Sequence, residues 1–303
     1  LTMEWLIFSA VGLILLVGDL VIVDRNAHKP SLREALIRTA VYVAVAVAFG
    51  VWVGFERGQD AGAKFFTGYA LEMSLSFDNV LVISMIFGAL GIPAPYRSRV
   101  LFWGIIGAIL LRGLFIGFGT LIVDNFKWLL VGFGIFLIFT GAKMLVPGAE
   151  EEEISVESSR TLRLLRRFVP VTNSLDGSRF FSAGAATPLF AALVLIEVTD
   201  LIFALDSIPA TFAVTVDPFL VFTSNMFAII GLRSLFFVLE AIVDRFRYLP
   251  MALSAALILI GGKAILEIVF GLHIEPLIGL LAVLGLLAAG MGASLIIKEK
   301  TND

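Results

Sequence analysis

The sequence predicts an all-α protein, a polytopic bundle of about nine transmembrane helices that contains an inverted repeat of three plus three helices. Of the 303 residues, 59% are hydrophobic and only 16% are charged, whereas soluble domains carry about 25% charged residues. Nine apolar stretches approach the roughly 20 residues that an α-helix needs to cross a bilayer. The expected helices lie at residues 3–23, 37–55, 66–90, 100–122, 128–147, 187–213, 219–241, 249–271 and 276–297.

The composition also excludes several classes of protein and of site. The chain has no cysteine and two histidines, which excludes thiolate metal sites, disulfides and imidazole-rich zinc or copper sites. The net charge of −3 gives no reason to expect a nucleic-acid partner. Because the sequence holds no zinc-protease, phosphate-loop or serine-hydrolase signature, we expect neither an enzyme nor a permanently bound cofactor.

The basic residues predict how the chain lies across the membrane, because Lys and Arg concentrate in cytoplasmic connections. One set of connections holds 15 of the 22 basic residues, and the opposite set holds 3. We therefore expect a multi-pass protein of the plasma membrane, with its N-terminus outside and its C-terminus in the cytoplasm.

The long polar stretch at residues 148–186 belongs to the cytoplasmic set. It begins with four glutamates at 150–153 and continues with an amphipathic basic stretch at 160–168. We expect a solvated linker whose basic helix rests on anionic lipid. A regulatory flap and an acidic vestibule that collects cations are the alternatives.

The segments before and after this linker resemble each other. Four motifs recur in the same order at nearly constant spacing: Glu72–Asn79 with Asp200–Ser207, Leu111–Phe115 with Leu232–Phe236, Val123–Phe126 with Val243–Phe246, and Gly141–Lys143 with Gly261–Lys263. Each unit contains three helices, and an odd number inverts the second copy, as in many secondary transporters. The predicted organisation is two flanking helices (1–65), a first repeat unit (66–147), the linker (148–186), a second, inverted unit (187–271), and a last helix with its tail (272–303).

Five carboxylic acids fall inside the first helices of the two units. They are Glu72 and Asp78 in the first unit, and Glu197, Asp200 and Asp206 in the second. An ionised carboxylate costs roughly 2.5–3.5 kcal/mol at the centre of a transmembrane helix. We therefore expect these groups to face one another, a cavity or a cation. Carboxylate and amide oxygens suit hard divalent cations such as Mn²⁺, Mg²⁺ and Ca²⁺.

Helical spacing completes the candidate metal site. Glu72, Ser76 and Asn79 share one face of a helix, and the second unit repeats this pattern. The candidate ligands are Glu72, Asp78, Asn79, Glu197, Asp200 and Asp206. Since Pro209 removes a backbone donor, we also expect the helix to kink or break beside Asp206 and to free carbonyl oxygens.

Two arginines inside the following helices could neutralise these acids. Arg112 and Arg233 are each either a counter-charge that holds the empty site or a plain structural partner, and the sequence leaves both open. In the structural alternative, the acids pair with these arginines or cap backbone groups and only lock the bundle. Asn225 is either an amide-oxygen ligand or a contact that joins helices.

Several of these stretches resemble the hallmark motifs of the TerC/Alx family. They are Glu72–Asn79, Arg99–Gly104, Glu197–Ala210 and Thr223–Leu235, and Arg166–Pro170 and Val243–Tyr248 also fit. The resemblance covers essentially the whole chain. The family is named after tellurium resistance, and its Alx-like members are associated with manganese export. The resemblance therefore implies Mn²⁺ efflux through the acids of the two repeat units, while some plant relatives are linked to membrane-protein insertion in thylakoids.

We predict a secondary transporter that exports Mn²⁺, with proton antiport as one way to couple it, by movement of one repeat unit against the other. Metal ions and protons compete for the same carboxylate oxygens. The predicted partners are the divalent ion, protons and the lipid bilayer, and no oligomeric state is predicted. A Ca²⁺/H⁺ exchanger is the alternative within transport, and a membrane scaffold or membrane-protein insertion factor is the alternative of another class.

Overall fold

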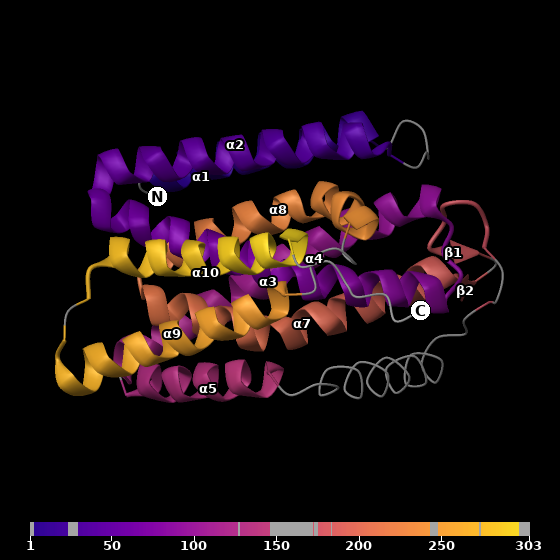
Figure 1. Ribbon diagram of the computed structural model, residues 1–303. Helices are drawn as coiled ribbons and strands as arrows, with labels where there is room; N and C mark the ends of the chain where they lie inside the picture. The colour runs from indigo at the N-terminus through magenta and orange to yellow at the C-terminus, as the bar shows by residue number, and fades with distance from the viewer. Residues whose placement is uncertain are drawn as a thin grey trace.

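The computed structural model describes residues 3–23, 30–126, 128–145, 172, 175–182, 184–242, 248–272 and 274–296. Within these ranges, the side chains at 19–23, 77, 78, 81, 121, 122, 124, 125, 205, 206, 241 and 242 are not described. The described residues form nine α-helices and one short pair of strands (Figure 1). These are α1 (Met3–Val23), α2 (Leu32–Arg57), α3 (Gln59–Ala89), α4 (Ala94–Asn125), α5 (Leu129–Met144), β1 (Phe181–Ser182), β2 (Ala185–Ala186), α7 (Pro188–Val214), α8 (Pro218–Ile242), α9 (Leu249–Phe270) and α10 (Pro276–Ile296). The predicted all-α membrane bundle is confirmed.

Six of the described helices, α2, α4, α7, α8, α9 and α10, are long and apolar enough to cross a membrane. α1 and α5 are apolar over shorter lengths. α3 has 31 residues but is not among the six, and its centre carries Glu72, Asp78 and several hydroxyl side chains. Several polar residues near its centre are buried among neighbouring helices, with Glu72 1% and Asn79 4% exposed. The bundle therefore encloses its most polar helix.

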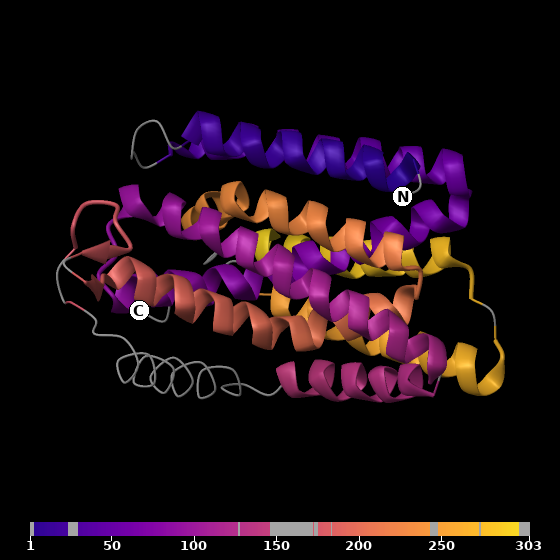
Figure 2. The ribbon, with the colours of Figure 1, turned by 180° about the vertical axis from the view of Figure 1, so that it is seen from behind.

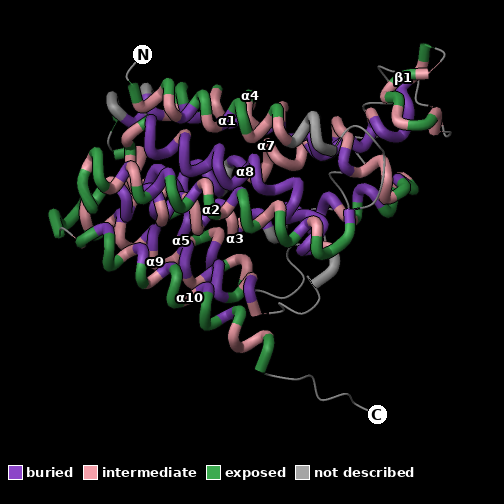
Figure 3. The backbone as a smooth tube through the Cα atoms, turned by 90° about the horizontal axis from the view of Figure 1, so that it is seen from above, coloured by how far each residue is buried: buried purple, intermediate pink, exposed green. Residues whose placement is uncertain are grey.

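α8 lies at the centre of the bundle. It contacts α1, α2, α3 and α4. Its apolar window is 94% buried, against 28% for α2 and α10, and Figure 3 shows it as an almost continuously buried stretch. α1 and α2 lie on one side of the bundle and α5 on the opposite side (Figures 1 and 2). The helix that holds Arg233 is thus shielded from lipid by its neighbours.

Contacts between the two predicted repeat units follow a symmetric scheme in which α3, α4 and α5 correspond to α7, α8 and α9. The pairs α3–α8 and α4–α7 are both in contact, as are α5–α7 and α3–α9. Counterpart helices also touch each other directly, in the pairs α3–α7, α4–α8 and α5–α9. They run antiparallel: Arg97 at the start of α4 forms an ion pair with Glu240 at the end of α8. This is the arrangement that an inverted repeat requires.

α5 and α9 meet in a contact that we call the glycine seam, formed by Gly134, Gly141, Ser254 and Gly261. A Cβ atom on Gly261 would lie 2.5 Å from the carbonyl oxygen of Gly134, and one on Gly141 would lie 2.7 Å from that of Ser254. The Ser254 hydroxyl donates a hydrogen bond to the Gly141 carbonyl across the seam. Small residues allow such close backbone approach between membrane helices. The seam therefore holds the third helices of the two units together without charge.

The two ends of the bundle carry different polar contacts. At one end, which we call the Arg57 end, the Arg57 guanidinium donates 2.7 Å hydrogen bonds to Glu4 Oε1 and to Asp217 Oδ2. This contact joins α1, α2 and the connection between α7 and α8. The other end holds the pair Arg97–Glu240 and is called the Arg97 end. It belongs to the connections that the basic residues predict to be cytoplasmic.

The predicted linker is described in part. The acidic run at 150–153 and the predicted amphipathic helix at 160–168 lie outside the described residues. The last residues of the linker form an antiparallel pair that the sequence did not predict, in which Phe181 lies opposite Ala186. Gly184, with a φ of 82°, supplies the left-handed conformation between the strands. The chain thus enters α7 from a short hairpin.

Candidate functional site

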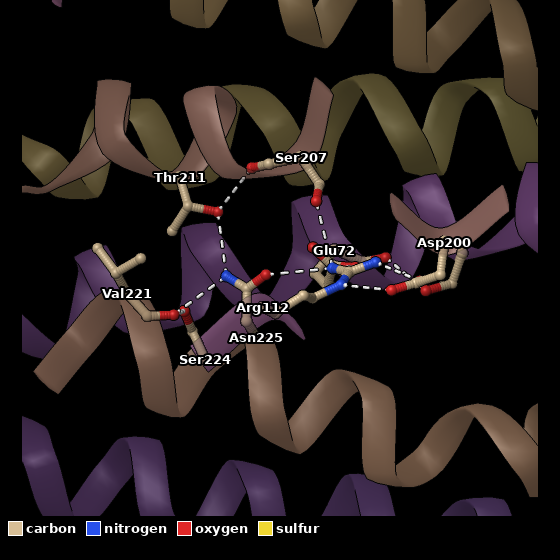
Figure 4. Close-up of polar contacts among 9 residues, drawn as sticks. Glu72, Arg112, Asp200, Ser207, Thr211, Val221, Ser224 and Asn225 are labelled. Carbon is tan, nitrogen blue, oxygen red and sulfur yellow. Dashed lines mark hydrogen bonds and ion pairs between the residues drawn. The ribbon is translucent and has the colours of Figure 1, made fainter. Parts of the chain in front are cut away.

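Arg112 lies at the point where α3, α4, α7 and α8 meet (Figure 4). Its side chain is 1% exposed and forms an ion pair with Glu72, which is equally buried. On the other side, Arg112 Nη2 and Nε donate to the two carboxylate oxygens of Asp200 at 2.8 and 3.3 Å. This two-point contact suits the planar guanidinium group. Arg112 therefore joins one acid from each repeat unit.

Polar side chains from α7 and α8 complete the surroundings of this arginine. Arg112 Nη1 also donates to Ser207 Oγ at 3.2 Å and to Asn225 Oδ1 at 3.3 Å. The Asn225 amide nitrogen donates to Thr211 Oγ1 at 3.2 Å and to the Val221 carbonyl at 3.0 Å. In this structure Asn225 thus joins α4, α7 and α8. The set is called the Arg112 network below, and its members are Glu72, Arg112, Asp200, Ser207, Thr211 and Asn225.

Three buried oxygens near this network lack a hydrogen-bond partner within the described part of the chain. They are Glu72 Oε2, Asn79 Oδ1 and Glu197 Oε2. A buried acceptor without a donor is costly, more so when it carries charge. All three atoms belong to residues that the sequence predicts as metal ligands. Each of these oxygens is available to accept a hydrogen bond or to bind a cation.

Glu197 is held against the backbone of α4. A Cβ atom on Gly107 would overlap both carboxylate oxygens of Glu197. Gly107 therefore makes room for an acid that a larger residue would displace. Because Glu197 precedes Asp200 by one helical turn, both of these acids lie on the surface of α7 that faces α4.

A cavity lies between the same four helices, on the Arg97 side of the Arg112 network. Its polar lining comes from Asn79, Thr199, Asp200 and Arg233, and the rest of the wall is mostly apolar. The Arg233 guanidinium carbon lies 5.5 Å from the ring centre of Phe102, a distance at which cation–π attraction is significant. Asp200 borders both the cavity and the Arg112 network, so it connects the two.

The structure brings some of the predicted ligands together and leaves others undescribed. Glu72 and Asp200 meet on Arg112, and Asn79 and Asp200 line one cavity. Asp78 and Asp206 lie in α3 and α7, and their side chains are outside the described residues. Among the side chains that are described, no three acidic or histidine residues gather closely enough to hold a metal ion. The six-residue ligand set stays a prediction.

Of the predicted kink or break beside Asp206, the break is wrong, and the kink stays a prediction. α7 is one helix from Pro188 to Val214, with Pro209 inside it. Membrane helices tolerate an internal proline when hydroxyl side chains and neighbouring helices satisfy the freed backbone groups.

Sequence reasoning missed two residues of the site. Thr211 follows Ser207 by one turn, so helical spacing alone could have placed it on the polar face. Gly107 gave no signal, because it is one of 28 glycines spread through the chain. Only the packing of Glu197 against α4 singles it out.

Comparisons with known proteins agree with this architecture. Residues 57–302 match the integral membrane protein TerC family. An uncharacterized membrane protein of Myxococcus xanthus is 46% identical over 297 residues, which cover 96% of this chain and 92% of that protein. An uncharacterized membrane protein of Rickettsia bellii is 38% identical over 301 residues, 98% of each chain. An Escherichia coli protein with the name "Putative membrane-bound redox modulator Alx" is 39% identical over 296 residues, 93% of this chain and 91% of that protein. No solved structure matches the chain.

Proposed function

The chain belongs to the TerC family of integral membrane proteins, and we propose that it is a secondary transporter that exports divalent cations, with Mn²⁺ as its substrate. The match over residues 57–302 confirms the family resemblance seen in the motifs. The names of the relatives state no transported substrate. Support for transport therefore comes from the chemistry of the buried site.

The observation that carries the proposal is an excess of acid at the junction of the two repeat units. The central parts of α3 and α7 hold five carboxyl groups, whereas the centres of α4 and α8 hold two arginines. Arg112 neutralises part of this charge through Glu72 and Asp200. Two arginines cannot match five acids, so the excess carboxyl groups require protons or a cation, since isolated charge is expensive at membrane depth. Oxygen ligands without thiols or imidazoles suit Mn²⁺ and other hard divalent ions.

The arrangement supports exchange of a cation for protons. A divalent ion in the cavity beside Asp200 and Asn79 would compete with Arg112 for Asp200 and with protons for all the acids. The cavity lies toward the Arg97 end, where the basic residues predict cytoplasm. In the orientation that we propose, with the N-terminus outside, a cation would enter from the cytoplasm while the Arg112 network closes the path to the outside.

The printed name of the Escherichia coli relative raises redox modulation as another activity. This chain has no cysteine, so its own side chains cannot carry out thiol–disulfide exchange. The Arg112 network, which joins four helices, also fits a membrane scaffold or insertion factor. The two classes differ in one measurable property, because a scaffold leaves the metal content of the cell unchanged.

Metal accumulation tests the proposal. Cells that express the protein and are loaded with Mn²⁺ should retain less manganese than cells without it, and Asp200→Asn should abolish the difference. Asp78→Asn and Asp206→Asn should do the same. The matched control is Asp176→Asn, which changes an acid that is 46% exposed and should export like the unchanged protein.

Measuring the calcium content of the same cells distinguishes Mn²⁺ export from Ca²⁺ export. A fall in calcium with constant manganese would make the protein a Ca²⁺ exporter. Unchanged contents of both ions, at normal amounts of protein in the membrane, would overturn the export proposal and favour the scaffold.

A further inference from the structure

The cavity and the Arg112 network occupy equivalent positions in the two repeat units. The repeat relates Arg112 to Arg233, and it relates Glu72 and Asn79 to Asp200 and Ser207. Continuing the same spacing along each helix relates the remaining members. Arg233 is the counterpart of Arg112, and Asn79 is the counterpart of Ser207. In the same way, Ile83 corresponds to Thr211 and Gly104 corresponds to Asn225. All four counterparts line the cavity, together with Asp200.

The two positions are filled differently. In the Arg112 network, Asn225 reaches from α8 to the guanidinium and Thr211 holds the Asn225 amide. In the cavity, the corresponding residues are Gly104 and Ile83, neither of which has a polar side chain. One position is therefore a closed polar network, and its counterpart is open.

The cavity contains an oxygen atom whose counterpart in the other repeat unit accepts a hydrogen bond in the Arg112 network. Ser207 Oγ accepts a hydrogen bond from Arg112. Its counterpart Asn79 has a buried Oδ1 without a partner among the described residues, and it shares the cavity with Arg233. Asn79 Oδ1 thus stands where the second arginine would donate.

We propose that Arg112 and Arg233 neutralise the same pair of acids in turn. In the structure described here, Arg112 binds Glu72 and Asp200 and closes the bundle toward the Arg57 end. In the opposite-facing state, Arg233 binds these acids and Asn79, closes the bundle toward the Arg97 end, and Arg112 withdraws. Each arginine is a positioning residue that holds one of the two states. This inference rests on the proposed alternating transport, and it names the groups that stabilise each state.

The exchange keeps the charge of the acids partly compensated in both states. Glu72 and Asp200 are each other's counterparts, so they remain the common centre while the arginine changes. A bound cation would share this centre with whichever arginine is present. Removing one arginine should therefore favour the state that the other one holds.

Sided labelling of single cysteines tests this proposal, and the natural absence of cysteine provides the background. Ile105 lines the cavity, and its counterpart Met226 is 1% exposed. Neither belongs to the Arg112 network. Ile105→Cys and Met226→Cys are each labelled with a membrane-impermeant maleimide in right-side-out and inside-out vesicles. Arg179→Cys and Asp60→Cys, at opposite ends of the bundle, report which face is exposed and so test the proposed orientation.

Reciprocal results are expected. In the otherwise unchanged protein, Ile105→Cys reacts from the Arg97 side and Met226→Cys is protected. Arg112→Gln should raise the labelling rate of Met226→Cys from the Arg57 side by more than about tenfold, in line with the cost of losing a buried pair. The same variant should lower the labelling rate of Ile105→Cys from the Arg97 side. Arg233→Gln should keep Met226→Cys protected, also when Mn²⁺ or a proton gradient is applied. Arg112→Lys, which keeps the charge but loses the two-point contact with Asp200, should lie between Arg112→Gln and the unchanged protein.

Several results would overturn the exchange. Increased labelling of both cysteines in Arg112→Gln would indicate general loosening, and the same response to both arginine variants would remove the reciprocity. Where Arg112→Gln does not reach the membrane in normal amounts, Ser207→Ala takes its place, because it removes one contact of Arg112 and keeps both acids and both arginines. The expected changes have the same direction and are smaller.

Manganese accumulation in the same strains separates this inference from the proposed function. Reciprocal labelling without any effect on manganese would leave the arginine exchange standing and refute Mn²⁺ export. Normal manganese export without reciprocal labelling would support Mn²⁺ export and refute the arginine exchange.

Discussion

The glycine seam and the Arg112 network both join counterpart helices of the two repeat units, but they do so by opposite means. The seam brings the backbones of α5 and α9 together, so that a Cβ on Gly261 would lie 2.5 Å from a carbonyl oxygen. The network joins α3, α4, α7 and α8 through charged side chains and borders a cavity. A tight backbone contact has one arrangement, whereas an arginine between two acids can change partners. If the protein works by the alternating transport that we propose, we expect α5 and α9 to stay in contact while the other four helices of the repeat units move.

The largest expected effect is at the network. Arg112→Ala leaves Glu72 and Asp200 buried without this counter-charge, and loss of one partner of a buried ion pair costs about 3–5 kcal/mol in the free energy of unfolding. Thermal unfolding of the purified protein in detergent measures this loss. Arg179→Ala is the matched control, because Arg179 is 74% exposed and its pair with Asp176 spans 3.4 Å. Equal stability of the two variants would show that the network does not hold the four helices together.

A smaller loss is expected at the seam. Gly261→Ala introduces a methyl group against the Gly134 carbonyl, and overpacking of this kind costs about 1–3 kcal/mol. The neighbouring Gly262→Ala is the control, since a Cβ there meets nothing within 4 Å. The same unfolding measurement should find Gly262→Ala as stable as the unchanged protein. If Gly261→Ala were as stable as Gly262→Ala, α5 and α9 would be able to separate freely, and the proposed fixed contact would be refuted.

The smallest effect concerns the single hydrogen bond that we describe across the seam. Ser254→Ala removes the donor to the Gly141 carbonyl and should lower the free energy of unfolding by about 0.5–1.5 kcal/mol, the usual net value of a hydrogen bond. Ser74→Ala removes a bond to Ala70 within α3 and should cost less, because it joins no second helix. Manganese export should be unchanged by Ser254→Ala if the seam does not move. A selective loss of export at normal stability would place movement at the seam instead.

The predicted bounds of a helix agree with the observed ones where proline or glycine marks its ends in the sequence. α9 was predicted at 249–271 and runs from Leu249 to Phe270, with a proline in its first turn and Gly271 at a φ of 66° just after its end. Other helices begin earlier than predicted. α3 begins at Gln59 and α4 at Ala94, because their first turns are polar and lie outside the apolar stretch that hydropathy detects.

The sequence predicted which acidic residues belong to the candidate site, but it could not predict which side chains bind each other there. The cost of buried charge was enough to predict that Glu72 and Asp200 would have polar or charged neighbours, and they meet on Arg112. The repeat makes Arg112 and Arg233 equivalent in the sequence, so no pattern could tell which of them binds the acids. The contact of Gly107 with Glu197 was likewise beyond prediction, since it depends on how closely α4 and α7 approach.

The spacing of the network along the chain has a consequence for how the protein is made. Glu72 and Arg112 are 40 residues apart, whereas Arg112 and Asp200 are 88 apart. α3 and α4 leave the ribosome as consecutive helices, so Glu72 and Arg112 can enter the bilayer as an ion pair long before α7 is synthesised. Asp200 then joins a guanidinium that already has one acid. The order of synthesis therefore favours Arg112 over Arg233 as the first arginine to hold the acids.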